Sequence, residues 1–180
     1  MTLDTVAALA RRAATASWFA AVGENLTAAE RAEAAGYLGA LGFAGVPIEG
    51  VTDWRQAKAL ADAPDWDPAW WHEEERLRVA LLAAASARHG RGTLLEALSR
   101  TTQGASDAAH GQAALAAARV GIADPALARA AAGSATQACY VAALAVSGAV
   151  DAEHPFLAKF RLFEAGRWPL GIVAGRFRLF

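Results

Sequence analysis

Apolar residues recur with a helical period along most of the chain, and glycine, proline and capping residues interrupt the pattern at short intervals. This spacing is typical of amphipathic helices joined by short turns. The expected helices cover residues 3–22, 27–41, 53–63, 68–89, 93–102, 107–120 and 125–148, with a last short one after Pro155. The chain is therefore expected to be all-α, a single-domain bundle of seven to eight helices over residues 1–180.

Several helix starts are marked by capping residues. Thr27 and Glu30 have the spacing of a capping box, in which each side chain bonds the backbone N–H of the other residue. Asp67 and Asp124 each precede a proline. An aspartate cap followed by proline at the first helical position is a strong signal for a helix start, because the ring is already set to the helical φ.

The end of the chain follows a different pattern. The stretch PLGIVAGRFRLF alternates apolar and polar residues and places Ala174-Gly175 between 171–173 and 176–180, which predicts a two-stranded ribbon with a two-residue turn. An isolated ribbon is only marginally stable in water. We therefore expect residues 166–180 to form a short C-terminal β-ribbon that packs on the bundle or on a partner chain.

Composition and charge narrow the class of protein. Alanine is the most frequent residue, which favours helices that approach one another closely. The net charge of −1 argues against a nucleic-acid binder, and no stretch is apolar enough to predict a membrane span. The single cysteine, Cys139, excludes an intramolecular disulfide and lies among apolar residues, so we expect a buried, inert thiol. Arg11 and Arg12 interrupt the apolar run near the start of the sequence, which does not fit a secretory signal, so the expected compartment is the cytoplasm.

The stretch WDPAWWHEEERLR at 66–78 carries the most chemistry. On a helical wheel Trp70 and Leu77 lie on the apolar stripe, whereas His72 and Arg76 face the opposite side. Glu74 falls near the centre of the stripe. A carboxylate there is desolvated unless it is paired.

Three interpretations of Glu74 remain open. It pairs with Arg78, one turn further on, at the edge of the core; it faces a ligand or a metal; or it is exposed because the stripe is narrow. The candidate ligand-binding residues are Glu74, His110, Trp70 and Arg78.

His110 is the second candidate. The wheel places it on the same face as Ala114 and Ala117, where small side chains leave space around the imidazole. It is either a hydrogen-bonded core histidine or the wall of a pocket. The spacing Asp107-x-x-His110 resembles half of the carboxylate-x-x-His element of ferritin-like di-iron bundles. The chain has no second copy of that element, so we expect Ser106 or Asp107 to cap the helix instead, and no metal site.

The two remaining histidines outside these stretches have simpler interpretations. His89 stands in RHGRG, which ends a helix, and is expected to be solvated. His154 precedes a proline in a turn and is expected to be structural.

Aromatic and basic residues gather in the last part of the chain, after His154. Arginine and aromatic residues dominate interface hot spots, so they are candidates for a subunit interface, although they equally suit a core with a solvated basic rim. The candidate interface residues are Phe163, Arg167, Trp168, Arg176, Phe177, Arg178 and Phe180.

These features favour a non-catalytic helical protein that acts by binding. We expect a homodimer or a complex with another protein, with a small apolar ligand as a further possibility, and neither nucleic acid nor membrane as a partner. The alternative is a small-molecule or metal-dependent enzyme with its site between the helices that carry Glu74 and His110. No cofactor is indicated, because the chain has neither a phosphate-binding loop nor a dinucleotide-binding motif.

Overall fold

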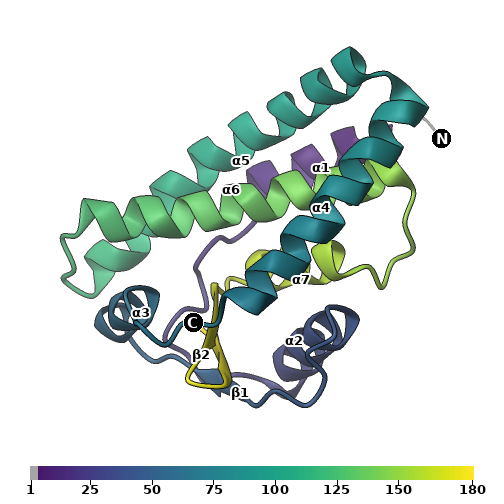
Figure 1. Cartoon of the computed structure of the whole chain (residues 1–180). Helices are drawn as coiled ribbons and strands as arrows, with labels where there is room; N and C mark the ends of the chain where they lie inside the picture. Colours follow the sequence, from purple (N-terminus) through teal and green to yellow (C-terminus); the bar gives the residue numbers. More distant parts are fainter. Residues whose placement is uncertain (1–3) are drawn as a thin grey trace.

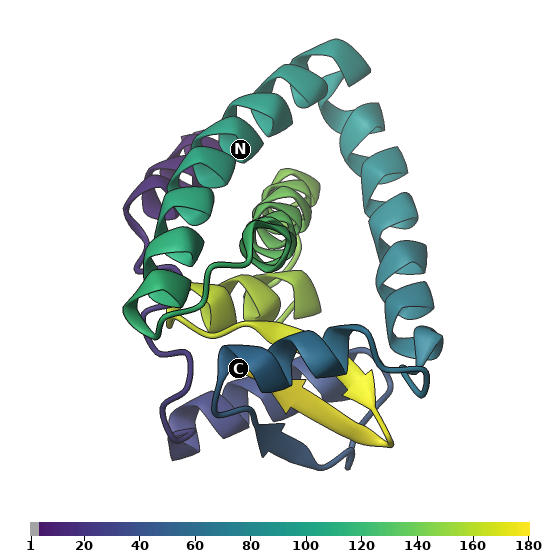
Figure 2. The same cartoon turned by 90° about the vertical axis from the view of Figure 1, so that its left-hand side faces the viewer.

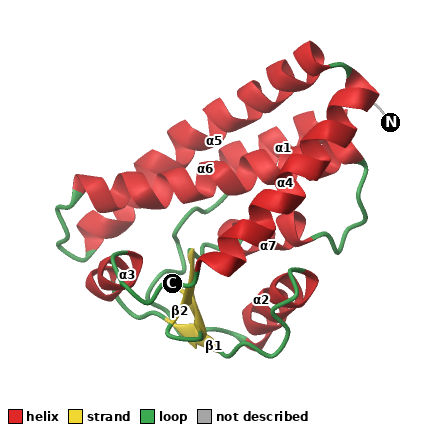
Figure 3. Cartoon of the chain, viewed as in Figure 1, coloured by secondary structure: helices red, strands yellow, loops and turns green. Residues whose placement is uncertain are grey.

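The computed structural model describes residues 4–180, and its helices and strands separate into a helical part and a smaller part that holds the sheet (Figure 1). Helices dominate, and the strands lie together near the C-terminus (Figure 3). The helices are α1 (Asp4–Thr15), α2 (Ala28–Ala40), α3 (Trp54–Ala61), α4 (Pro68–His89), α5 (Arg91–Arg119), α6 (Pro125–Gly148) and α7 (Pro155–Glu164). The strands are β1 (Ile48–Gly50), β2 (Pro169–Val173) and β3 (Arg176–Leu179). The predicted all-α bundle with a short C-terminal β element is confirmed.

Helix α6 runs through the middle of the helical part. Seen end-on, it is surrounded by α5, α4 and α7 (Figure 2), and it also packs on α1. Its alanines are buried on several sides, which small side chains permit because neighbouring backbones can approach closely. In the described part of the chain α6 alone is long and apolar enough to cross a membrane, but 61% of its most apolar window is buried inside the protein. That burial is typical of a core helix.

Helix α5 is one continuous helix, and the expectation of two helices at 93–102 and 107–120 is wrong. The residues between these two ranges are polar or small, and none of them is a proline. Packing on α6 and α1 therefore keeps this stretch helical. Asp107 caps nothing. It lies mid-helix, where its carboxylate accepts a hydrogen bond from the Gln103 amide at 3.2 Å.

Helix α1 ends earlier than the predicted range 3–22, whose first residue lies outside the described part of the chain. The chain leaves the helix after Thr15, and Phe19 takes a left-handed φ of 59°. This turn buries both Trp18 and Phe19. The Trp18 indole donates to the Ala13 carbonyl at 3.0 Å, so burial of two large rings outweighs continuation of an alanine-rich helix.

The C-terminal ribbon is confirmed and is part of a larger sheet. Strands β2 and β3 pair antiparallel around the turn at Ala174-Gly175, with Ile172 opposite Phe177. Strand β1, which the sequence pattern did not indicate, pairs parallel with β3, so that the order is β1-β3-β2. The last strand of the chain is therefore the central one, and the sheet packs on α2 and α4 through Tyr37 and Trp70.

Candidate functional site

A cleft of about 510 Å³ lies between α4 and α6, and the sheet and α7 close its base. We call it the tryptophan cleft, because four of the six tryptophans of the chain line it. Its lining residues are Ala61, Trp66, Trp70, Trp71, Glu74, Glu75, Arg78, Ala130, Gly133, Ser134, Gln137, Val141, Lys159, Trp168, Pro169 and Leu170. The α6 side is made of small and polar residues, whereas indole rings make the opposite side.

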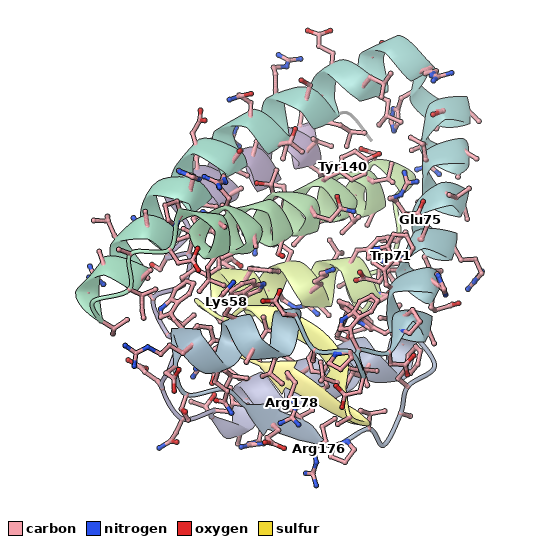
Figure 4. The ribbon with its side chains drawn as sticks, turned by 60° about the vertical axis from the view of Figure 1, so that its left-hand side comes forward. Lys58, Trp71, Glu75, Tyr140, Arg176 and Arg178 are labelled. Atoms are coloured by element: carbon pink, nitrogen blue, oxygen red, sulfur yellow. The ribbon has the colours of Figure 1, made fainter. Side chains whose placement is uncertain are left out.

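Helix α4 supplies one wall, and its start explains the geometry. The Asp67 carboxylate accepts a hydrogen bond from the Ala69 backbone N–H at 2.9 Å, so the helix begins at Pro68. Positions 70, 71, 74, 75 and 78 then fall on one broad face, because they are three to four residues apart. Figure 4 shows Trp71 and Glu75 of α4 on the side of the helix that faces Tyr140 of α6.

The base of the cleft holds a buried polar network around Glu74. Lys159 of α7 donates to both carboxylate oxygens of Glu74, at 2.9 and 2.7 Å. The Tyr37 hydroxyl donates to Glu74 Oε1 at 2.7 Å and accepts from the Trp70 indole N–H at 2.5 Å. Glu74 and Lys159 are only 8% and 6% exposed, so this is a buried ion pair whose carboxylate accepts three hydrogen bonds from the protein.

The network also perturbs the titration of Tyr37. Burial raises the pKa of this phenol well above its ordinary value, and the neighbouring Glu74 charge raises it further. Tyr37 therefore stays protonated and acts as a hydrogen-bond donor to the carboxylate. It is fully buried and does not line the cleft, so it orients Glu74 from behind.

Of the three interpretations of Glu74, pairing with Arg78 is wrong, and so is exposure, because the side chain is buried. Arg78 donates instead to Glu75, three residues before it, and it lies near Tyr140 of α6. The hydrogen bond to Arg78 lowers the pKa of Glu75, and the hydrogen bond to Glu75 raises the pKa of Arg78. Glu74 pairs with Lys159 instead. This lysine is 85 residues away in sequence and approaches the carboxylate from inside the core.

Three of the four predicted ligand-binding residues come together in this cleft: Trp70, Glu74 and Arg78. His110 does not join them. It lines a separate cavity of about 480 Å³ at the turn between α5 and α6, together with Ala114 and Ala117. Its side chain is exposed, so the interpretation as a core histidine is wrong, whereas the placement beside these alanines at a pocket wall is correct.

Two of the other histidines contact backbone groups. His89 is partly buried and its Nε2 lies 2.9 Å from the Ser147 carbonyl, so it is not simply solvated as expected. His154 caps α7 by accepting from the Phe156 backbone N–H, and burial lowers its pKa. Among residues 4–180 no three histidine, cysteine or carboxylate side chains lie close enough together to hold a metal ion.

The residues proposed for a subunit interface pack within their own chain. Phe163, Trp168, Phe177 and Phe180 are buried among other aromatic rings. Arg167 is 1% exposed; it pairs with Glu30 and donates to three backbone carbonyls of the loop at 21–25. Arg178 is partly buried against Glu49, and Arg176 alone of the seven is exposed. The four aromatic residues and Arg167 therefore belong to the core of their own chain, and of the three arginines only Arg176 is exposed.

Two members of the site were missed by the sequence pattern. Lys159 carried a readable signal, because it shares the buried face of α7 with Pro155 and Leu162, and a buried ammonium requires an anionic partner. Tyr37 has no such signal in the sequence, since a tyrosine among alanines and a leucine is an ordinary core residue.

The chain matches no known protein-family model, no curated protein and no solved structure. Function is therefore inferred from the chemistry of the cleft.

Proposed function

We propose that the protein is a non-catalytic binding protein that holds a small molecule in the tryptophan cleft. The volume of about 510 Å³ lies within the range of small-molecule sites, which are mostly apolar with a few placed polar groups. Four indole rings that line one cleft are the observation that carries this proposal. Large aromatic rings offer extensive contact area and lose little conformational entropy when a ligand packs on them.

The pairing of charges favours binding over catalysis. The four ionisable side chains that line the cleft form two ion pairs, Glu74 with Lys159 and Glu75 with Arg78. A general base or a nucleophile has to be free to exchange a proton or attack a substrate. The Ser134 hydroxyl, which also lines the cleft, donates to the Ala130 carbonyl at 3.0 Å and makes no hydrogen bond to a basic side chain among the described residues.

The test uses a substitution that fills the cleft without disturbing the fold. Gly133 lies on the α6 wall, and a Cβ added there meets nothing within 4 Å. Gly133→Leu therefore projects a side chain into the cleft, and replacing a helical glycine does not weaken the helix. Gly104→Leu is the matched control, because Gly104 is a helical glycine with the same open space on α5, outside the cleft.

The measurement is native mass spectrometry of the three proteins with a fragment library that contains neutral, cationic and anionic compounds. We expect at least one compound to be retained by the wild type and by Gly104→Leu and to be lost from Gly133→Leu. If no compound is retained, or if Gly133→Leu retains the same compounds, the cleft is not a small-molecule site.

A cytoplasmic location and a homodimer remain part of the proposal. The free, buried Cys139 is compatible with a reducing compartment. Large apolar side chains exposed on α4 and α5, such as Val79 and Leu95, offer surface for a second copy, now that the C-terminal aromatic residues are known to be buried. Sedimentation velocity would contradict the dimer if the protein stayed monomeric at micromolar concentration.

A further inference from the structure

The tryptophan cleft has the form of an aromatic cage, but the cation position of that cage is already filled. The Lys159 ammonium lies 5.2 Å from the ring centroid of Trp70, within the range of a cation–π contact. The same ammonium bonds both oxygens of Glu74. An incoming organic cation would need this indole face and this carboxylate, and both are occupied by a cation of the protein.

The second carboxylate of the cleft is occupied in the same way. Glu75 accepts two hydrogen bonds from the Arg78 guanidinium. A ligand cation at either carboxylate would therefore meet Lys159 or Arg78, and a ligand anion at either cation would meet Glu74 or Glu75. The four charges sum to zero, so neither sign of ligand charge finds an uncompensated partner.

The remaining surface suits a flat ring. Trp66 and Trp70 stand edge to face, with centroids 6.2 Å apart and an angle of 83° between their planes. A planar ligand that stacks on one ring meets the edge of the other, which is the favoured arrangement of aromatic groups. On the α6 side Ala130 and Gly133 have almost no side chain, which leaves room for a thin molecule.

The indole N–H of Trp168 is a hydrogen-bond donor that a ligand could use. Trp70 gives its N–H to Tyr37, but the N–H of Trp168 has no acceptor among the described residues. Trp168 is only 3% exposed, and it lines the cleft. Indole nitrogens donate only, so a ligand oxygen would satisfy it.

We infer that the tryptophan cleft takes an uncharged, planar aromatic molecule that carries carbonyl oxygens, and that Lys159 excludes organic cations by occupying their position. This inference rests on the proposed function, because it names the class of ligand for the same cleft.

The experiment compares four probes of similar size. Coumarin is planar and uncharged and has a carbonyl; octahydrocoumarin has the same ring skeleton without aromaticity; N-methylquinolinium is a planar cation; 2-naphthoate is a planar anion. Binding is followed through the indole N–H signals of ¹⁵N-labelled protein. The signals of Trp66, Trp70, Trp71 and Trp168 report on the cleft, and Trp18, which is buried against Phe160 and Phe163, is the internal control.

We expect coumarin to shift the four cleft signals and leave Trp18 unchanged, and the other three probes to bind at least about tenfold more weakly. If N-methylquinolinium or 2-naphthoate binds the cleft as tightly as coumarin, the inference is wrong although the cleft still binds small molecules. The same holds if octahydrocoumarin equals coumarin. If none of the four probes moves the cleft signals, both the inference and the proposed function fail.

A substitution tests the part played by Lys159. Lys159→Met removes the internal cation and opens Glu74 and the Trp70 face, so affinity for N-methylquinolinium should rise about tenfold or more. Arg161→Met is the matched control, because Arg161 lies on the same helix and pairs with Glu33 outside the cleft. A folded Lys159→Met protein with unchanged cation affinity would overturn the exclusion mechanism. If the variant does not fold, the four-probe comparison on the wild type decides the question.

Discussion

Glu74 and Lys159 join α4 to α7 through an ion pair that water barely reaches. Removing one member of such a pair leaves the other charged and buried without a partner. Tyr37 holds the carboxylate on the side away from the cleft, so the network keeps the Trp70 indole in place as well. The same residues therefore shape the cleft and stabilise the fold.

We therefore predict that Glu74→Gln lowers the free energy of unfolding by about 3–5 kcal/mol, because Lys159 stays buried without a counter-charge. Urea unfolding at neutral pH measures this change. Glu73→Gln is the control, since Glu73 only pairs with Arg76 on the helix surface, and it should have little effect. Equal effects of the two substitutions would show that the buried pair does not stabilise the protein.

Glu30 gives the protein a sensitivity to acid. Its hydrogen bonds to the buried Arg167 lower its pKa from the ordinary 4.5 to about 2. A lowered pKa in the folded state stabilises the protein above pH 4.5, and this contribution is lost as the pH falls from about 4.5 to 2.

We therefore predict that Glu30→Gln lowers the free energy of unfolding by about 1–3 kcal/mol at neutral pH. The variant should also lose less stability than the wild type as the pH falls below 4.5. Thermal melts between pH 2 and pH 7 test it. Glu24→Gln, an exposed side chain with no ion pair among the described residues, should keep the wild-type pH profile. A profile of Glu30→Gln that is as steep as that of the wild type would contradict this assignment.

The helices show which capping signals act in the folded protein. Asp124 accepts hydrogen bonds from the Ala126 and Leu127 backbone N–H groups at the start of α6, whereas Asp107 lies within α5. Both were candidates for helix starts in the sequence. Of these two, only Asp124, which is followed by proline, begins a helix.

Asp124→Ala is accordingly predicted to lower the melting temperature by a few degrees, because two N–H groups at the start of α6 lose their acceptor. Asp107→Ala should leave it nearly unchanged, since the alanine continues a helix and only the bond from Gln103 is lost. Differential scanning calorimetry of the two variants distinguishes these outcomes. A similar loss for both would mean that α5 is interrupted near Asp107.

The C-terminal strand is the element on which the sheet depends. Strand β3 pairs with both β1 and β2, and Phe177, Leu179 and Phe180 are fully buried. Deletion of residues 174–180 removes the middle of the sheet and three large apolar side chains. At roughly 1.5–3 kcal/mol for each side chain, the loss is comparable to the total stability of a typical domain.

We expect the truncated protein to be largely unfolded or to melt far below the full-length chain, as circular dichroism would show. Arg176→Ala, at the exposed start of the same strand, is the control and should melt like the wild type. A truncated chain with the melting temperature of the full-length protein would mean that the ribbon does not pack on the core.

At the scale of the whole molecule, the tryptophan cleft lies where three apolar clusters meet, and Val141 of α6 belongs to the smallest of them. Trp168 and Leu170 belong to the largest cluster, which includes α1, α5 and α6. Trp70 belongs to a second cluster, formed with α2, α7 and the sheet. The residues that line the cleft are therefore held in place by packing in separate parts of the core, as is usual for preformed ligand sites.

Cys139 reports on the integrity of the largest cluster. It is completely buried in α6, and burial raises the pKa of its thiol to about 12. We predict that it does not react with a disulfide reagent in the native protein, and that its reactivity rises with urea along the same curve as the loss of helical signal. Rapid reaction of the thiol without denaturant would show that this part of the core opens locally.

Most of the helices, the caps at Thr27, Asp67 and Asp124, and the terminal hairpin could be predicted from the sequence, because they depend on residues that are close together in the chain. The burial of Glu74 could be predicted for the same reason, since neighbouring positions on one helix define its apolar face. The partner of Glu74 could not, because Lys159 meets it only after α7 has packed against α4. Tertiary packing likewise decided three other features: α5 is continuous, β1 joins the sheet, and His110 lies apart from Glu74. Local pattern determines which side of a helix is apolar, but contacts between distant segments determine what that side touches.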